Sequence, residues 1–535
     1  MTLKDEERQP LLSAQPVQSA TETLPEDDEK ASRWRSIFPK IEVTDSRFRF
    51  LPLIGCLTVL LNEGEYYFKQ IGYFRAIEAL YCIEYFQSHD PAVAHLGKGI
   101  PENMCKLDSI QKKVATANGI VMLVRMTSSF IGTMIVGYLA DKYGRRLALI
   151  LHKVGTIIYT LVVCSTYLGY PYVPIWVSFC GGLGGLIGAN FDLNLAVLLA
   201  AYNDALVSST QVATYFFITT SMQYVGQVSF PLLAGKAINL DGKGGTSELS
   251  LFTSLGMAFA GLVISVLFFP ETMKKPEQAD IPGGGDTDEC TKRKGVSAVI
   301  AAKAKSLGEG FQQSVQGVGA TNVILLLVAM FLATTAIKAV DWLGLIQYPV
   351  IKFGWKYNQS TFAMAFQAVV YIFTYFALLP TYNKLGARYA LSPSSTSLLV
   401  MLLSVTLLIA GSIFLGLSAT PPHFVAATCI YTLGAGMPAV MQAYIANLVQ
   451  KSSLGRLLAI VSLFQVGGKM AASALGPIII NAGIDSGNDN LKGAVFFFAA
   501  IVFACSASAL GVVALRAGVT TDRAEDMGVV DDNDA

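Results

Sequence analysis

Twelve stretches of about 20 predominantly apolar residues account for most of the chain, and a helix of that length crosses the hydrocarbon core of a bilayer. Only 14% of the 535 residues are charged, whereas charged residues make up about 25% of an ordinary soluble domain. The sequence therefore predicts an all-α polytopic membrane protein with twelve transmembrane helices. They are predicted at residues 51–70, 115–140, 147–168, 174–200, 210–234 and 249–269 in the first half, and at 321–346, 359–379, 397–418, 422–448, 456–480 and 493–515 in the second.

The distribution of Lys and Arg in the short connecting loops predicts the orientation of these helices. Basic loops remain on the cytoplasmic side of a membrane. The loops after predicted helices 3 and 9 contain neither residue, whereas the loops after helices 2, 8 and 10 are basic, so both termini are expected in the cytosol. The basic residues are Lys142, Arg145, Arg146, Lys384, Arg388, Lys451 and Arg456.

Similarities within the chain predict two related halves. Residues 141–146 are weakly repeated at 383–388, and a proline lies late in predicted helices 5 and 11, at Pro231 and Pro477. Transporter folds with such repeats have a substrate site between two pseudo-equivalent bundles. The predicted domains are a disordered cytosolic tail (1–47), an N-terminal six-helix half (48–270), a cytosolic linker with an amphipathic helix (271–320), a C-terminal six-helix half (321–515) and a cytosolic tail (516–535).

The most highly charged short connection is residues 137–146, between predicted helices 2 and 3. In this segment Gly137 would allow another helix to approach closely, and Gly144 would suit a tight turn. Asp141 is the only acid there, and Arg145 and Arg146 are among its cations. The simplest interpretation is a basic turn that only orients two helices.

The spacing of these residues also closely resembles the cytoplasmic loop signature of the major facilitator superfamily, whose members are secondary transporters with two six-helix halves. Residues 270–272, Pro-Glu-Thr, resemble the ending of helix 6 in that family. The resemblance covers roughly residues 50–515 and implies that residues 137–146, the signature loop, act as a conformational latch. In that latch Asp141 interacts with the start of the eleventh helix, around Gly455.

Polar side chains within the predicted helices are the candidate substrate and proton sites. A charge at the middle of a membrane helix costs at least about 2.5 kcal/mol, so each one requires a partner or a water-filled cavity. Asp192 is the first choice for proton coupling and Glu63 the second. The candidates are Glu63, Arg125, Asn190, Asp192, Lys338, Asp341 and Lys469.

Each of these candidates has a structural alternative. Lys338 and Asp341 lie three residues apart on one helix, so a local salt bridge is an alternative to a substrate contact. Lys469, like Glu65, could instead extend its charged group to water near a helix end. Asp192 could belong to a permanently bonded polar network that holds its helix in place.

The predicted external loops contain two candidate modification sites. The first loop, about residues 73–113, contains Cys82 and Cys105 on the side of the membrane where disulfides persist. The hypothesis is that they are paired, and the alternative is two unrelated thiols. The sequon at Asn358 falls in the predicted loop between helices 7 and 8, which predicts glycosylation there.

The predicted N-terminal tail contains a short pattern with a possible role in sorting. Glu7, followed four residues later by Leu11 and Leu12, resembles an acidic dileucine signal, which adaptor proteins bind on cytosolic tails. So short a pattern also arises by coincidence. The expected location is the plasma membrane, with the vacuolar membrane as the alternative.

Further resemblances favour a function in export. Residues 73–86 and 100–105 resemble a fungal branch of the superfamily that is distantly similar to proton-coupled folate and tetracycline transporters. Residues 226–235 resemble an antiporter signature, with Phe230 in place of its central glycine. The leading prediction is proton-coupled efflux of a drug-like or secondary metabolite. The alternatives are uptake of an organic anion or nutrient by proton symport, for which the intramembrane cations are candidate ligands, and a nutrient receptor that signals without transport.

Other function classes have little support in the sequence. The formal net charge of +1 gives no reason to expect a nucleic-acid partner, and the eight cysteines match no metal-ligand spacing. Only four histidines are present and no nucleophile–base arrangement is recognisable, so neither an enzyme nor a cofactor is predicted. The glycines of residues 181–188 are expected to allow close helix packing, because no Lys-Ser/Thr follows them as in a phosphate loop.

Overall fold

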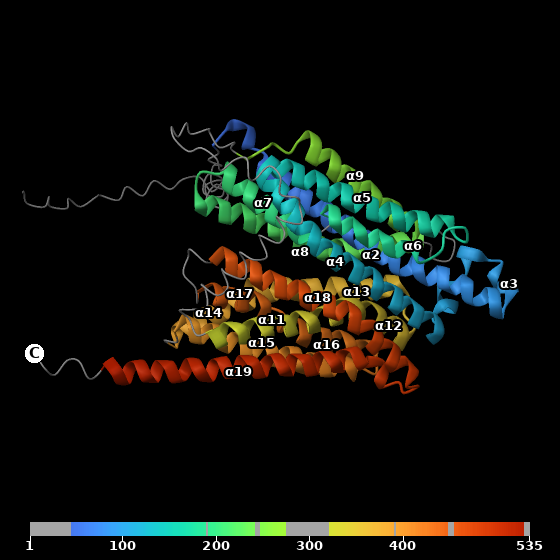
Figure 1. Cartoon of the computed structure of the whole chain (residues 1–535). Helices are drawn as coiled ribbons and strands as arrows, with labels where there is room; N and C mark the ends of the chain where they lie inside the picture. The colour runs from blue at the N-terminus through green and yellow to red at the C-terminus, as the bar shows by residue number, and fades with distance from the viewer. Residues whose placement is uncertain are drawn as a thin grey trace, which may run out of the picture.

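The computed structural model describes residues 44–188, 191–240, 247–273, 320–389, 392–447 and 454–528. In these ranges the chain forms two bundles of six long helical segments, which lie one above the other in Figure 1. This arrangement confirms the predicted all-α fold with two six-helix halves.

Short breaks divide some of the twelve segments into two or three elements. The first bundle consists of α2 (Leu51–His89), α4 (Asp108–Tyr143), α5 (Arg145–Gly169), α6 (Val177–Cys180) with η4 (Gly181–Ile187) and α7 (Phe191–Ala205), α8 (Ser209–Leu240), and α9 (Glu248–Leu267). The second consists of α11 (Ala320–Ala339) with η5 (Val340–Gly344) and α12 (Leu345–Phe353), α13 (Tyr357–Phe373) with η6 (Thr374–Leu378) and α14 (Leu379–Arg388), α15 (Pro393–Gly416), α16 (Pro421–Leu433) with α17 (Met437–Asn447), α18 (Leu454–Asp485), and α19 (Ala494–Gly528). The short helices are η1 (Ser46–Phe48), α3 (Pro91–Ala94), η2 (Gly97–Gly99), η3 (Glu102–Cys105) and η7 (Leu491–Gly493).

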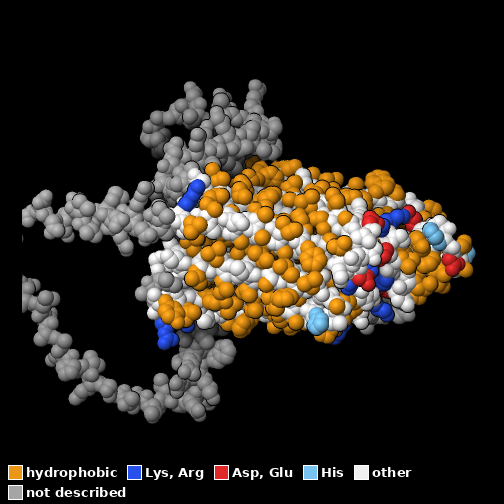
Figure 2. Space-filling model, turned by 90° about the horizontal axis from the view of Figure 1, so that it is seen from below, with side chains coloured by type: hydrophobic (Ala, Val, Ile, Leu, Met, Phe, Trp, Pro, Cys, Tyr) orange, Lys and Arg blue, Asp and Glu red, His pale blue; other side chains and the backbone are white. Residues whose placement is uncertain are grey.

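The outer surface of the bundles is suited to lipid. Nine helices in the described ranges are long and apolar enough to cross a membrane. Figure 2 shows apolar side chains over most of the flank, with charged side chains gathered towards the two ends of the molecule. Because charged groups are costly in hydrocarbon, this distribution places the flank in the bilayer and the ends in water. The chain is a multi-pass integral membrane protein.

The two ends of the molecule are named here by their most distinctive features. The turn between α4 and α5, at Gly144, marks the loop end. At the opposite end a disulfide joins Cys82 of α2 to Cys105 of η3, the pairing proposed from the sequence, and marks the disulfide end. In Figure 1, α7 and α17 lie towards the loop end, and α3 and α12 lie towards the disulfide end.

Two predicted boundaries are wrong because the helices extend beyond their apolar windows. The predicted loop at residues 73–113 begins too early, since α2 continues to His89. In this extension Arg75 and Glu78 are both buried, with 3.2 Å between Arg75 Nη1 and Glu78 Oε2, so paired charges stabilise a helix that hydropathy does not reveal. The tail predicted from Arg516 is also wrong in its first part, because α19 remains helical to Gly528.

The fourth and tenth predicted helices are each interrupted near the middle. The fourth changes to a 3₁₀ helix over η4, and the tenth is broken between α16 and α17. At Gly185 an added Cβ would lie 2.7 Å from the backbone nitrogen of Ser129 in α4, which confirms the predicted close packing. Transporter folds commonly build their sites from such discontinuous helices.

The seventh and eighth segments each contain one wide π-helical turn, namely η5 and η6. Such turns are frequent at functional sites because they redirect side chains within an otherwise regular helix. Asp341 and Trp342 belong to η5, and Tyr375 belongs to η6. All three face the central cavity described below.

The signature loop requires glycine at one of its two glycine positions. Gly144 has φ +116°, and an added Cβ would lie 2.1 Å from Oε2 of Glu271, so a side chain is excluded there. The Glu271 carboxylate accepts hydrogen bonds from the backbone nitrogens of Arg145 and Arg146, at 2.9 and 3.2 Å, and so caps the start of α5. At Gly137 no atom of the described residues lies within 4 Å of an added Cβ, so the expected close approach of another helix is not observed in this conformation.

The charged side chains of the signature loop are paired within the first half. Arg145 Nη1 donates to Asp141 Oδ1 at 2.6 Å, and Arg145 Nε donates to Asp204 Oδ2 at 3.2 Å. Arg146 Nη2 donates to the carbonyl of Val266. Among the described residues, no hydrogen bond or ion pair joins Asp141 to α18, the helix that contains Gly455.

Among the described residues, four hydrogen bonds or ion pairs join the two halves at the disulfide end. The backbone nitrogen of Tyr357, at the start of α13, donates to Glu102 Oε1 at 2.8 Å. The other three are Gln347 Nε2 to the carbonyl of Gln111 at 3.0 Å, Asn481 Nδ2 to Thr116 Oγ1 at 2.9 Å, and an ion pair between Lys112 and Asp485. Between them Gly119 packs directly against Pro477. The two bundles are therefore held together at this end.

Several predicted features lie outside the described residues. These are the dileucine-like pattern of Glu7, Leu11 and Leu12, the linker from residue 274 with its amphipathic helix, and Asn190. The side chain of Asp192 is also outside the description.

Candidate functional site

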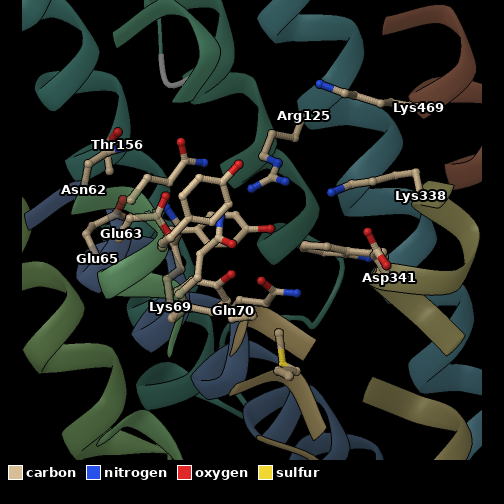
Figure 3. Close-up of a pocket in the computed structure, with 18 of the residues that line it drawn as sticks. Asn62, Glu63, Glu65, Lys69, Gln70, Arg125, Thr156, Lys338, Asp341 and Lys469 are labelled. Atoms are coloured by element: carbon tan, nitrogen blue, oxygen red, sulfur yellow. Dashed lines mark hydrogen bonds and ion pairs between the residues drawn. The ribbon is translucent and has the colours of Figure 1, made fainter. Parts of the chain in front are cut away.

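A cavity of about 370 Å³ lies between the two bundles (Figure 3). Its volume falls within the range of roughly 300–1,000 Å³ that is typical of small-molecule sites. The first half contributes side chains from α2, α4, α5 and α8, and the second half contributes side chains from α11, η5, α13, η6 and α18. Both halves therefore shape one site.

Helix α2 supplies an ion pair to the cavity wall. Residues four apart lie on the same face of a helix, and Lys69 Nζ is paired with Glu65 Oε1. Glu65 is only 3% exposed and Lys69 only 5% exposed. The alternative that Glu65 extends to water at a helix end is therefore wrong. Pairing offsets part of the cost of burying each charge.

A second polar network fastens α2 to α5. Asn62 Oδ1 lies 2.8 Å from His152 Nε2 and accepts a hydrogen bond from Lys153 Nζ at 3.1 Å. The other ring nitrogen, His152 Nδ1, lies 2.8 Å from the carbonyl oxygen of Gly188 at the break in the fourth helix. His152 and Lys153 are both buried. The network therefore holds three elements of the first half around the cavity.

Glu63 differs from these neighbours because its carboxyl has no hydrogen-bond or ion-pair partner among the described residues. It lines the cavity and is 3% exposed. On its other side, an added Cβ at Gly226 of α8 would lie 2.7 Å from Glu63 Cβ. The antiporter-like segment predicted at residues 226–235 thus begins in contact with this side chain.

Arg125 of α4 is held by aromatic rings from both halves. Its Cζ lies 5.6 Å from the ring centroid of Tyr66 in α2 and 5.2 Å from that of Trp342 in η5. Arg125 Nη2 also lies 3.1 Å from Met122 Sδ. Cation–π contacts of this kind attract a guanidinium to the ring faces and orient it.

The second half contributes two lysines and an acid. Lys338 Nζ lies 5.5 Å from the Trp342 ring, and Lys469 of α18 extends to the same part of the cavity in Figure 3. The Asp341 carboxylate accepts hydrogen bonds from Gln367 Nε2 at 2.9 Å and from the Tyr371 hydroxyl at 3.4 Å. Asp341 is therefore tied to α13 rather than only to its own helix.

The structure thus brings five predicted site residues to one cavity, and their roles remain predictions. They are Glu63, Arg125, Lys338, Asp341 and Lys469. Sequence reasoning missed His152 and Lys153 in α5 and the buried pair of Glu65 with Lys69. The sequence contained a signal for Lys153, because a lysine within the apolar window at 147–168 is as unusual as the charged residues that were chosen as site candidates.

The predicted glycosylation site does not lie in a loop. Asn358 is in the first turn of α13, where its backbone lies 3.3 Å from the position of an added Cβ at Gly235 of α8. Its side-chain oxygen and the hydroxyl of Ser360 are buried. The loop assignment is therefore wrong, and glycosylation of Asn358 stays a prediction.

Sequence comparison finds relatives among named transporters. The chain is 26% identical over 423 residues to an MFS-type transporter, aprT, of Aspergillus flavus, which covers 77% of this chain and 78% of that protein. It is 25% identical over 429 residues to the MFS efflux pump atnC of Emericella nidulans, with coverage of 77% and 78%. It is also 24% identical over 373 residues to the class H tetracycline resistance protein of Pasteurella multocida, with coverage of 69% and 80%. No protein-family model matches the chain.

Solved structures identify the fold. The human organic anion transporter MFSD10 is similar, with a TM-score of 0.54 and 15% identity over 87% of this chain and all of that chain. A D-xylose–proton symporter gives a TM-score of 0.55 with 13% identity, and covers 87% of this chain and 97% of that chain. The chain has the major facilitator fold. The predicted resemblance to fungal members, distantly related to a tetracycline resistance protein, is confirmed by the sequence relatives.

In the major facilitator fold, a cavity between the halves can open to either side when the bundles rock against each other. Here the cavity holds paired charges, an acid without a partner among the described residues, and cations from both halves. Such a surface can bind a polar solute and exchange protons with it. No group of three or more His, Cys, Asp or Glu side chains suited to a metal ion occurs in the described ranges.

Proposed function

We propose that the protein is a secondary transporter that moves a small organic solute across a membrane by alternating access, coupled to protons. The observation that carries this proposal is the charged cavity between two six-helix halves that contact each other at the disulfide end. Both halves contribute charged groups to it, so rocking of the halves would change the surroundings of a bound solute.

Export is the preferred direction. Two similar fungal proteins are named as efflux pumps, and the contact between Gly226 and Glu63 connects the antiporter-like segment with an acid in the cavity. Secondary metabolites or drug-like molecules are the proposed solutes. Uptake by proton symport is the second candidate, and the structural similarity to a proton symporter favours it as an alternative.

The proposed orientation puts the loop end in the cytosol, because its turn is basic. The observed conformation would then be closed to the outside. The proposed location is the plasma membrane, with the vacuolar membrane as the alternative, and a sorting adaptor is the proposed partner of Glu7, Leu11 and Leu12.

The decisive experiment is transport in proteoliposomes with and without an imposed pH gradient. The probes are 2-naphthalenesulfonate, trimethyl(2-naphthyl)ammonium and phenyl glucoside, which represent anionic, cationic and neutral aromatic solutes. At least one should move against its concentration gradient only when protein and the pH gradient are both present. Identical fluxes of all three in protein-free vesicles would contradict the proposal.

The signature loop is proposed to act as a latch that closes the cytosolic side in the outward-facing state. Asp141→Asn should reduce the transport rate several-fold while substrate affinity and expression change little. The Asp141 side chain is 67% exposed, and exposed ion pairs contribute about 0–1 kcal/mol, so loss of its pair with Arg145 should not unfold the protein. Rates are measured in vesicles at matched protein density. A normal rate would exclude the latch.

Gly119→Leu is expected to prevent closure of the disulfide end. An added Cβ at Gly119 would lie 2.0 Å from Cγ of Pro477, on the opposite half. Overpacking of this kind costs about 1–3 kcal/mol, which would shift the open-to-closed ratio about 5- to 150-fold.

The measurement for this variant is the reaction of a reporter cysteine, Ala368→Cys in the cavity wall, with an impermeant methanethiosulfonate added outside cells. Labelling should rise in the Gly119→Leu background relative to the parent. Gly256→Leu is the matched control, because no atom lies within 4 Å of an added Cβ there. Equal labelling in all three backgrounds would contradict the proposal that the contact between Gly119 and Pro477 closes the outer side of the cavity.

A further inference from the structure

A short segment of the first half caps a helix of the second half at the disulfide end. The first backbone N–H groups of an α-helix have no partner within the helix, and a carboxylate placed near them is stabilised by the helix dipole. In α13 the N–H of Tyr357 donates to Glu102 Oε1 at 2.8 Å. Glu102 is 3% exposed and Tyr357 is 1% exposed. Because the two atoms belong to different halves, separation of the halves at this end breaks the cap.

The side chain of Tyr357 is enclosed by the same half that supplies the cap. Its ring centroid lies 4.5 Å from Lys106 Nζ and 5.8 Å from the ring centroid of Phe74 in α2. Lys106 also orients the capping carboxylate, since its Nζ lies 2.8 Å from Glu102 Oε1. The first half therefore holds the start of α13 through both the backbone and the side chain of its first residue.

The segment that supplies the cap is anchored to α2 by a covalent bond. Residues 102–106 are called the strap, and their 3₁₀ helix η3 is only four residues long, which is too short to be stable alone. Cys105 in the strap is bonded to Cys82 of α2. Glu78, one turn earlier on the same face of α2, lies 2.8 Å from Lys106 Nζ. The disulfide and an ion pair thus fix both the position and the direction of the strap.

We propose that the strap keeps the disulfide end closed, and that the disulfide holds it in the position from which it caps α13. This inference rests on the proposed function, in which that end opens during each transport cycle. Opening requires the Tyr357 N–H to leave the Glu102 carboxylate, so this charge-assisted hydrogen bond stabilises the closed state. Without the disulfide the strap must be ordered each time the cap forms, and this entropic cost weakens closure.

The test is the distance between two spin labels at the disulfide end, measured by double electron–electron resonance on the purified full-length protein. The labels are placed at Ala92→Cys in α3 and at Asn490→Cys beside η7, which are exposed positions in different halves. The six cysteines outside the disulfide are replaced by alanine, so that only these two positions carry labels. A component at longer distance reports the open state.

Two substitutions at Tyr357 separate the cap from the side chain. Proline is favoured at the first residue of a helix, and Lys356 already has the extended conformation that a following proline requires, with φ −75° and ψ 154°. Tyr357→Pro and Tyr357→Ala both remove the ring, but only Tyr357→Pro removes the N–H. Relative to Tyr357→Ala, Tyr357→Pro should therefore raise the open-to-closed ratio about tenfold or more.

The role of the disulfide is tested by combining Cys82→Ser with Cys105→Ser. This double variant should also raise the open-to-closed ratio, because the strap is no longer anchored. In the Tyr357→Pro background the same change should add little, since the cap is already absent, whereas in the Tyr357→Ala background it should keep its effect. An equal increase in both backgrounds would show that the disulfide does not act through the cap, and would overturn the inference.

The remaining outcomes separate this inference from the proposed function. Matching distance distributions for Tyr357→Pro and Tyr357→Ala would overturn the strap, as would an unchanged distribution after loss of the disulfide. Far-UV circular dichroism checks that each variant is folded, and the disulfide variant tests the strap with Tyr357 intact. A strap-dependent shift in a protein that transports none of the three probes would support this inference and overturn the transporter. Proton-driven transport with distributions that do not depend on the strap would do the reverse.

Discussion

Glu63→Gln is expected to abolish proton-driven accumulation of solute and to leave solute exchange across the membrane intact. The carboxyl of Glu63 is buried in the cavity wall and has no partner among the described residues. A carboxyl can take up a proton on one side and release it on the other, whereas an amide of the same size cannot. The variant should therefore bind solute and rock between states without coupling them to the proton gradient.

Two flux measurements in the same proteoliposomes check this prediction. Accumulation is measured with an imposed pH gradient, and exchange is measured with solute on both sides at equal pH. Glu84→Gln is the control, because Glu84 is an exposed acid on the same helix, 2.9 Å from Lys113. Normal accumulation by Glu63→Gln would assign coupling to another group. Asp192→Asn, the first choice from the sequence, is then tested in the same way.

Glu102→Gln is expected to have the largest effect on stability. Glu102 Oε1 lies 2.8 Å from Lys106 Nζ and also accepts the backbone hydrogen bond from Tyr357 of the opposite half. Arg75 and Glu78 complete the buried cluster, in which Lys106 also lies 2.8 Å from Glu78. Removing one partner of a buried ion pair costs about 3–5 kcal/mol, because the other charge remains without full compensation.

The melting temperature of the detergent-purified protein should therefore fall by several degrees in Glu102→Gln. In the double variant with Lys106→Gln one positive and one negative charge are both removed, so it should lose less stability than Glu102→Gln alone. The exposed pair gives the control, since Glu84→Gln should change stability by less than about 1 kcal/mol. Strictly additive effects of the two substitutions would show that Glu102 and Lys106 do not act as a pair.

The sequence by itself determined the class of fold and the existence of a polar site. Apolar windows, basic loops and the repeat of 141–146 at 383–388 are local properties, and they predict twelve helices in two halves because membrane helices must satisfy their backbone groups internally. The cost of burying charge likewise marked Glu63 and Arg125 as candidates before any contact was known.

Only the tertiary structure decided which of these groups meet. Glu102 and Tyr357 are distant in sequence, and nothing in either segment predicts that one caps the helix of the other. Likewise, Asp341 accepts a hydrogen bond from Gln367 on a different helix. This contact depends on the π-turn at η5 and on how α13 packs against it. Hydropathy reports the length of a helix but not its rotation about its axis. That rotation, set by side-chain packing between helices, determines which polar faces share the cavity.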